Sequence, residues 1–474
     1  MDNAPEKISA FEKRLKRQVI GKPHRFLAVI PLGFEQTFVR EILAIPPDSG
    51  SPAGMTQSLK STDIRILGDG KVKFTAKLVE AWKIAAYSRI ANRVLMHIAD
   101  FKAENFRDLE KKTADIPWEL FLPEERHVDI HVTCKHSRLY HSGAVAERLY
   151  KVIEGGSLPL ASATSSWRAA TRHLAVSSAT PSPRGSAPNT PHSTSLYVTL
   201  IDDRCTIWLD LAGEELYKRG HERFVNDAPL KETIAAAMLF EATRIADAPV
   251  ALFDLMAGSG TFSLEAAYAA NRLIPGVCRD FALKHQPAFK EPTWDFLIRR
   301  ETRDERREKG NNILKIVTSD ISERAVEIIQ HNVECSPLAK STTGEQAAPT
   351  INPQHRDFFS YTAAEIADAC PGEASPVILL NPPYGKRLDV DAPGLYTRLG
   401  RRLAELARAL EPLGKHLTVG ILAPKDDSRE GSKFTCTGNL LREFPELDPA
   451  RNPHAKKIAT SHGGIGLNAL FARV

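Results

Sequence analysis

The second half of the chain alternates short apolar runs with longer amphipathic segments. The short runs have the pattern of strands that are buried on both faces, and the longer segments have helical spacing. The apolar runs cover residues 250–254, 313–318, 376–380 and 416–422. The amphipathic segments cover residues 228–246, 260–272, 322–335 and 393–411. This alternation predicts an α/β domain with a doubly wound, mostly parallel sheet.

The first part of the chain has a less regular pattern, which predicts a small α+β module. In HVDIHVTC, Val128, Ile130 and Val132 fall on one face, as they do in a half-buried strand. The other expected elements are a strand over 24–31, a helix that begins at Gly33, two short strands within 63–75, and helices over 78–90 and 137–153. Two strands around the turn Asp202-Asp203-Arg204 are expected to open the alternating region, from residue 195 onward.

Polar stretches interrupt this pattern at residues 46–58, 177–195 and 340–350. Their content of Pro, Gly, Ser and Thr predicts loops, and the stretch 177–195 is so poor in large apolar residues that we expect a flexible insertion. We find no internal repeat.

Composition and charge add little to this prediction of the fold. The 474 residues suggest two to four domains. The formal net charge of +5 permits a nucleic-acid partner without establishing one. A basic stretch near the N-terminus predicts a solvated helix face or an unstructured tail. Its residues are Lys7, Lys13, Arg14, Lys16 and Arg17.

The six cysteines form no CxxC pair, which argues against a zinc knuckle and a disulfide framework. No metal site is therefore expected. The N-terminus lacks the apolar core of a signal peptide, and no stretch approaches the roughly 20 apolar residues of a membrane span. These features predict a cytoplasmic protein with no membrane contact.

A glycine-rich turn follows the apolar run 250–254. The sequence reads Asp254-Leu-Met-Ala257-Gly258-Ser259-Gly260-Thr261 and leads into a helix. Glycines let the backbone turn tightly and approach a ligand, and a helix N-terminus offers free N–H groups. The turn lacks the Gly-Lys-Ser/Thr of a phosphate-binding loop, and Leu264 replaces a third glycine. An acidic residue here suits a ligand with a positive amino-acid head, such as S-adenosylmethionine; a plain helix–strand turn is the alternative.

Nucleotide folds place a carboxylate after their second strand to hold the ribose hydroxyls. Asp320 follows the apolar run 313–318, whereas Asp280 has the usual spacing of about 20 residues but no preceding strand. We therefore expect Asp320 to take this role, which implies an insertion over about 271–312. Asp357 follows in HRDFF, where an adenine amino group would lie, and a plain loop aspartate is an equal alternative.

The apolar run 376–380 leads directly into Asn381-Pro382-Pro383-Tyr384. Two prolines remove two N–H donors, so the carbonyl of Pro382 and the side-chain oxygen of Asn381 are both available as acceptors. Two acceptors that converge on an NH₂ group hold its hydrogens and direct its lone pair toward an electrophile. Tyr384 offers a flat face for a base lifted from its stack. The motif predicts methylation of an exocyclic amine but leaves the base open, and a simple turn is the alternative.

At these residues the chain resembles the THUMP-containing guanine-N2 methyltransferases of large-subunit ribosomal RNA and their tRNA-modifying relatives. The resemblance covers most of the chain. The segments that carry it are LDLAGEELYKRGHER (209–223), APLKETIAAAML (228–239), FDLMAGSGTFSLEAA (253–267), PGVCRDFALKHQPAFKEPTWDF (275–296), TSDISERAVEIIQHN (318–332) and LLNPPYGKRL (379–388). Residues 26–42 and 88–153 are similar to the family's ferredoxin-like segment and THUMP module.

The resemblance implies a domain order and a role for each matching residue. It implies a ferredoxin-like segment over 22–60, a THUMP RNA-binding domain over 61–155, a linker with an insertion over 156–195, and a Rossmann-like methyltransferase domain over 196–474. Residues implied for S-adenosylmethionine are Asp254, Ala257, Gly258, Ser259, Gly260, Thr261, Asp320, Ile321, Asp357, Phe358 and Asn381. Residues implied for the target base are Asn381, Pro382, Pro383 and Tyr384.

The family implies structured RNA as the partner, ribosomal RNA first, with a monomer possible. Some bacterial members carry a second methyltransferase domain, for which the given chain is too short, so we expect a member with a single such domain. The alternatives are a tRNA guanine-N2 methyltransferase, an adenine-N6 methyltransferase of DNA or RNA, and a non-catalytic RNA-binding protein.

Overall fold

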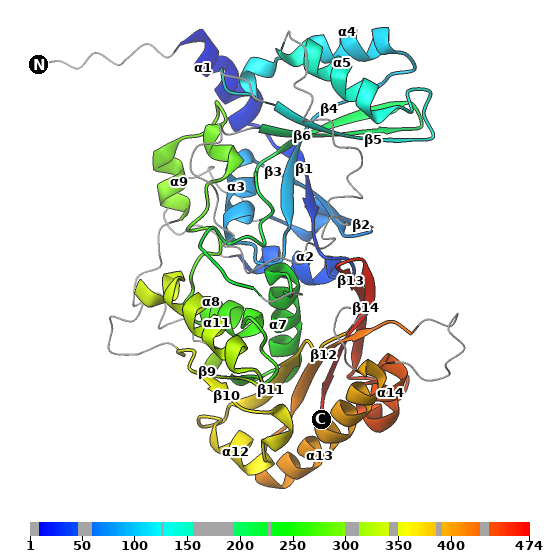
Figure 1. Cartoon of the computed structure of the whole chain (residues 1–474). Coiled ribbons are helices and arrows are strands. Elements are labelled where there is room, and N and C mark those ends of the chain that lie inside the picture. The colour runs from blue at the N-terminus through cyan, green and yellow to red at the C-terminus, as the bar shows by residue number, and fades with distance from the viewer. Residues whose placement is uncertain are drawn as a thin grey trace, which may run out of the picture.

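The computed structural model describes residues 9–45, 59–124, 128–154, 194–225, 229–298, 312–340, 349–384, 391–426 and 436–474. Within these ranges the chain forms two seven-stranded sheets, one at each end of an elongated molecule (Figure 1). We call them the first and second sheet in chain order. The expected linker and the loops at 46–58, 177–195 and 340–350 lie wholly or mostly outside the described residues.

The second sheet confirms the doubly wound α/β fold. Its strands follow the order β10-β9-β8-β11-β12-β14-β13, in which the first five are parallel and β14 runs antiparallel to both its neighbours. The strands are β8 (Val250–Asp254), β9 (Ile313–Asp320), β10 (Pro353–His355), β11 (Ser375–Leu380), β12 (Thr418–Pro424), β13 (Lys456–His462) and β14 (Ile465–Arg473).

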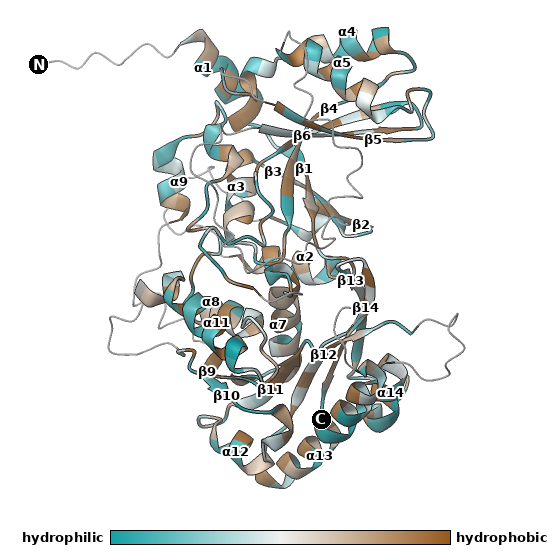
Figure 2. Ribbon diagram, viewed as in Figure 1, coloured by the Kyte–Doolittle hydropathy of each residue, from teal (hydrophilic) through white to brown (hydrophobic). Residues whose placement is uncertain are grey.

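Helices cover both faces of the second sheet because alternate residues of its central strands point to opposite sides. Leu252 and Val377 pack in a core with helices α7, α8 and α11, whereas Phe253 and Ile378 pack in a separate core with α12, α13 and α14. Figure 2 shows these strands as mainly hydrophobic ribbons. The helices are α7 (Glu232–Ala246), α8 (Thr261–Ala270), α11 (Glu323–Glu334), α12 (Ala363–Asp368), α13 (Ala392–Leu410) and α14 (Cys436–Glu443).

The first sheet has the order β2-β3-β1-β4-β7-β6-β5. Its strands are β1 (His24–Val29), β2 (Ile64–Gly68), β3 (Lys71–Ala76), β4 (Arg93–Lys102), β5 (Val128–Lys135), β6 (Thr194–Ile201) and β7 (Arg204–Asp210). The helices of this part are α1 (Ala10–Leu15), α2 (Glu35–Ala44), α3 (Leu78–Tyr87), α4 (Phe106–Ala114) and α5 (Ser142–Glu154), and α9 (Glu291–Leu297) packs against α3.

The hairpin β6–β7 belongs to the first sheet, which corrects the expectation that it opens the catalytic domain at residue 196. Strand β6 pairs with β5 in parallel, and β7 pairs with β4. The segments 22–60 and 61–155 likewise share this one sheet, because β1 lies between β3 and β4. We therefore place the start of the catalytic module after Asp210.

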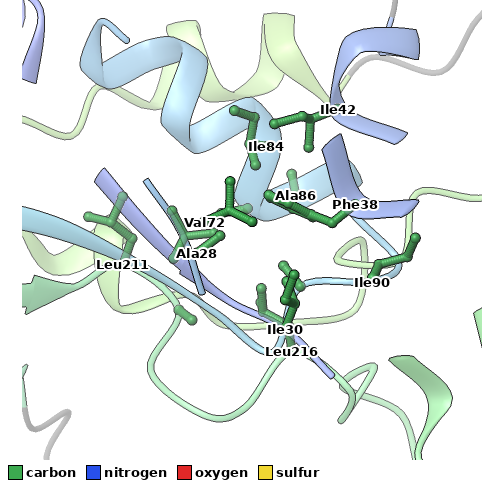
Figure 3. Packing of buried hydrophobic residues seen from close by; sticks show 14 of the residues in the cluster. Ala28, Ile30, Phe38, Ile42, Val72, Ile84, Ala86, Ile90, Leu211 and Leu216 are labelled. Carbon is green, nitrogen blue, oxygen red and sulfur yellow. The ribbon is translucent and has the colours of Figure 1, made fainter. Parts of the chain in front are cut away.

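We call the first sheet with its helices the first module, and the part after Asp210 that contains the second sheet the second module. Two groups of contacts join these modules. Figure 3 shows Phe38 and Ile42 of α2 packed near Ile84 of α3, with Leu211 and Leu216, which follow β7, in the same core.

The second group is ionic. Glu265 of α8 accepts hydrogen bonds from Arg219 at 2.9 and 3.1 Å and lies 3.5 Å from the guanidinium of Arg89, which follows α3. The side chains of Arg219 and Glu265 are 4% and 1% exposed, so the ion pair is almost completely shielded from water. Helix α8, which carries the glycine-rich turn at its start, is thereby fixed to the first module.

Candidate active site at the strand ends of the second sheet

The polar residues predicted from the sequence lie at the ends of four adjacent strands. Asp254 ends β8, Asp320 ends β9, Asp357 follows β10 by two residues, and Asn381 follows β11 directly. These strands are parallel neighbours in the order β10-β9-β8-β11, so their carboxyl ends form one edge. The chain reverses its direction of travel across the sheet between β8 and β11. Ligands of open α/β sheets bind in the crevice at such a reversal.

Asp254 is a buried carboxyl group with a perturbed proton affinity. Its side chain is 1% exposed and its Oδ2 accepts hydrogen bonds from the Ser263 hydroxyl at 2.8 Å and the Ser263 N–H at 3.1 Å. Burial raises the pKa of Asp254 to about 7, although the bonds from Ser263 oppose that shift, and the nearby charge of Asp320 adds to it. A positively charged ligand would favour the ionised carboxylate.

The glycine-rich turn is fastened to the end of β9. The N–H of Ala257 donates to the carbonyl of Ser319 at 3.1 Å, and the N–H of Gly258 donates to Oδ2 of Asp320 at 2.8 Å. The other oxygen of Asp320 accepts from the N–H of Ser322 at 2.9 Å. Because a carboxylate has about four acceptor positions, Asp320 keeps capacity for two ribose hydroxyls.

The two glycines of the turn are required for different reasons. Gly258 and Gly260 have φ angles of 58° and 75°, in the left-handed region that favours glycine. A Cβ at Gly260 would also lie 3.1 Å from Ile329 of α11, whereas a Cβ at Gly258 would meet nothing within 4 Å. The turn therefore packs tightly against α11 at Gly260 and is open at Gly258, where a ligand can approach the backbone.

The residues expected around an adenine differ in exposure. Ile321 is 66% exposed, which is unusual for an isoleucine next to a buried strand, and its side chain is free to cover a ring. Asp357 accepts a hydrogen bond from the N–H of Phe359 at 3.1 Å, so the loop itself fixes its carboxylate. The side chain of Phe358 is 1% exposed and packs in the core of α12 to α14. Only the main chain of Phe358 can therefore meet a ligand.

The Asn381 motif contains a buried acceptor that lacks a donor. Oδ1 of Asn381 is buried and has no hydrogen-bond partner among the residues that the structure describes. In the same ranges no hydrogen bond reaches the carbonyl of Pro382. Tyr384 packs against the larger core, and burial raises the pKa of its phenol well above the usual range, so the ring is neutral. Buried acceptors are normally satisfied, and an amino group of a ligand would satisfy these.

Arg223 and Asn332 also support the turn, and sequence reasoning missed both. The guanidinium of Arg223 donates to the hydroxyls of Thr261 at 2.6 Å and Ser259 at 3.3 Å. The amide of Asn332 donates to the carbonyl of Ser259 at 3.1 Å. No local pattern marks these residues, because Arg223 lies 36 residues before Ser259 and Asn332 lies 73 residues after it.

Across the described ranges, no three His, Cys, Asp or Glu side chains are grouped so that they could hold a metal ion. In the same ranges no helix combines the length and hydropathy that a membrane crossing requires.

Comparison with known proteins agrees with the geometry. Residues 219–411 match the family described as RMKL-like, methyltransferase domain. The chain is 27% identical over 409 residues to the putative RNA methyltransferase YpsC of Bacillus subtilis, covering 84% of this chain and 93% of that protein. It is 25% identical over 420 residues to the ribosomal RNA large subunit methyltransferase K/L of Alteromonas mediterranea, covering 88% of this chain and 51% of that one. The chain thus spans about half the length of that relative.

A solved structure shares the fold over nearly the whole chain. The crystal structure of SMU.472, a putative methyltransferase complexed with SAH, aligns with a TM-score of 0.64 at 20% identity, covering 95% of this chain and 98% of that one. The family match lies on the sheet that carries the Asp254 turn and the Asn381 motif, and the relatives extend over both modules. Residues 219–411 therefore match an RMKL-like methyltransferase domain, and S-adenosylmethionine is the cofactor.

Proposed function

We propose that this protein transfers a methyl group from S-adenosylmethionine to the exocyclic N2 amine of a guanine in large-subunit ribosomal RNA. The observation that carries the amine assignment is the buried Oδ1 of Asn381, which lacks a donor among the described residues and lies at the strand end beside β8. The ribosomal RNA assignment is supported by the names of the K/L relatives.

The chain's own residues would act mainly by positioning. When bound, S-adenosylmethionine supplies an electrophilic methyl group. Asn381 and the carbonyl of Pro382 would accept the two amine hydrogens and so hold the nitrogen lone pair in line for attack. Tyr384 would stack on the base. The amine loses its proton after it has been methylated, so no strong base is required, and an amide rather than a carboxylate suffices at position 381.

The residues at the ends of β8, β9 and β10 would bind successive parts of the cofactor. Asp254 would stabilise the positive amino group, Asp320 the ribose, and Asp357 with the main chain of Phe358 the adenine. Ala257, Gly258, Ser259, Gly260 and Thr261 would contribute backbone and hydroxyl contacts around the methionine portion. Ile321 would cover one face of the adenine.

The role of Asp254 predicts a pH-dependent affinity for S-adenosylhomocysteine, the product form of the cofactor. Without ligand, the pKa of Asp254 is about 7 in the folded state and 3.8 as the reference value. Its ionisation therefore opposes folding, and the stability that this group provides at low pH is lost as pH rises from about 4 to about 7. A bound ammonium favours the ionised form, so calorimetry should show affinity rising by up to about tenfold between pH 6 and pH 8.

The Asp254→Asn variant is the control, because it cannot ionise. It should bind more weakly and lose this pH dependence. Equal affinity of the wild type at both pH values would contradict the amino-group role.

Three alternatives remain as outcomes of one experiment. Nucleosides of ribosomal RNA, tRNA and DNA from a strain that lacks this protein are measured by mass spectrometry. Loss of an N2-methylguanosine from large-subunit ribosomal RNA supports the proposal. Loss of the same nucleoside from tRNA supports the tRNA alternative, and loss of N6-methyladenine supports adenine. The same set of nucleosides in strains with and without this protein would support a non-catalytic RNA-binding protein.

A further inference from the structure

A short basic helical segment precedes the first sheet. We call residues 9–22 the N-terminal basic segment; it contains five Lys or Arg residues and a single acidic residue, Glu12. It begins with α1 and continues through a turn of π-helix at Lys16–Ile20. Ser9 and Glu12 cap its start reciprocally, at 3.1 and 3.0 Å. Residues 10–20 are therefore helical, as the expected helix face requires, whereas Lys7 lies outside the described residues.

The two sides of this segment differ sharply. Leu15 and Val19 are each 2% exposed and belong to the larger core cluster, which extends through both modules. Lys13, Lys16 and Arg17 are exposed. Residues three and four apart share one side of a helix, so these three cations form one face and the two apolar residues form the opposite one.

Contacts with the rest of the module hold the segment in place. Arg14 pairs with Glu119 at 3.0 Å, and a ring nitrogen of His24 lies 2.7 Å from the carbonyl of Val19. Because Leu15 and Val19 are also buried, the basic face has a fixed orientation. A fixed cationic face loses less conformational entropy on binding than a flexible chain does.

The charges on the basic face are not neutralised within the described residues. Lys13, Lys16, Arg17 and Lys22 make no ion pair or hydrogen bond with any described carboxylate. Glu12 caps the helix at the residue next to Lys13, so its carboxylate is engaged there. The three cations of the basic face, with Lys22 just after the helical turns, therefore have no carboxylate partner among the described residues and form a surface that suits a polyanion.

We infer that the N-terminal basic segment binds phosphates of the RNA substrate outside the catalytic crevice. This inference rests on the proposed function, which makes RNA the substrate. Phosphate contacts position a protein on a nucleic acid without reading its sequence, and lysine and arginine are the residues that make them. A membrane surface fits less well, because binding in a bilayer requires a continuous free apolar side, and here Leu15 and Val19 are buried in the protein's own core, which leaves Phe11 as the one large apolar side chain of the described segment that is more than a third exposed.

The test is the salt dependence of RNA binding. The variant Lys13→Gln/Lys16→Gln/Arg17→Gln removes the face and leaves Leu15 and Val19 in place. The control variant Lys315→Gln/Arg451→Gln/Lys457→Gln removes three exposed basic residues from the second module, with the same change in net charge. The probe is an in vitro transcript of large-subunit ribosomal RNA, and affinity is measured between 50 and 300 mM KCl.

Each phosphate contact contributes about 0.7 to 0.9 to the slope of log K against log salt concentration. We expect the slope to fall by about 2 to 3 in the basic-face variant and by less than about 1 in the control, with both variants folded by circular dichroism. Equal slopes for the basic-face variant and the wild type would overturn the inference, as would equal losses in the two variants. If instead the basic-face variant lost binding to anionic lipid vesicles and kept its RNA slope, a membrane partner would replace RNA.

Measuring methylation of the same transcript distinguishes failure of this inference from failure of the proposed function. If the wild type methylates the transcript but the wild type and the basic-face variant have equal salt slopes, the proposed function stands and only the inference about the basic segment is wrong. A wild type that binds the transcript with the expected slopes but methylates only tRNA or DNA removes the ribosomal assignment. A wild type with no measurable RNA affinity removes both.

Discussion

Replacing Asn381 by alanine is expected to lower the methylation rate constant by about 100- to 1,000-fold, the range seen when one preorganised hydrogen-bonding group is removed from an active site. The affinity for S-adenosylhomocysteine should stay within about twofold, because the cofactor is held mainly by the turn at 254–261 and by the end of β9. Single-turnover methylation of RNA and calorimetry measure the two quantities separately.

The Asn381→Asp variant provides a matched control. It keeps an acceptor oxygen at the position of Oδ1, so it should retain more activity than the alanine variant. Activity of Asn381→Ala within about twofold of the wild type would show that this side chain does not hold the amine. Equal loss of cofactor binding and of activity would show that it supports the cofactor instead.

Replacing Glu265 by alanine is expected to have the largest effect on stability. It would leave Arg219, whose side chain is 4% exposed, without its carboxylate partner, and would remove the carboxylate that lies 3.5 Å from Arg89. Breaking one side of a buried ion pair typically costs about 3 to 5 kcal/mol. Urea denaturation should show this loss of unfolding free energy. Because Glu265 lies on α8, cofactor affinity should weaken as well.

The control for this prediction is Lys151→Ala, which removes the exposed pair between Lys151 and Glu147, whose side chains are 47% and 50% exposed. Exposed pairs contribute about 0 to 1 kcal/mol. A Glu265→Ala variant that unfolds at the same urea concentration as Lys151→Ala would show that the ionic contact between the modules is not structurally important.

The local pattern of the chain predicts the central strands of the second sheet and the polar residues at their ends. Strands β8, β9 and β11 are apolar runs with a polar residue at or directly after their end, and their parallel arrangement brings these ends to one edge. Asp254, Asp320 and Asn381 could therefore be placed together before any coordinates were known. The antiparallel pair β13–β14 was not foreseen. Strand β10 was missed because its three residues, Pro353 to His355, carry no apolar signal.

The first sheet was harder to predict for physical reasons. Strand β4 lacks a clean alternation because a bulge between His97 and Ala99 shifts its register, which moves later side chains to the opposite face. The membership of β6 and β7 depends on pairing with residues that lie far away in sequence, such as Lys102 with Arg204. Local periodicity reports which side of a strand is buried but not which strand lies beside it.

The place of β6 and β7 in the first sheet has a consequence for how the protein is made. Strand β5 joins that sheet only through β6, and β6 only through β7. When the ribosome has synthesised the first 154 residues, β5 therefore has no strand to pair with, and it must wait until residue 210 has emerged. Contacts between distant segments form slowly, and an unpaired strand edge favours aggregation while it persists. The newly made N-terminal half should accordingly be the stage at which this protein depends most on chaperones.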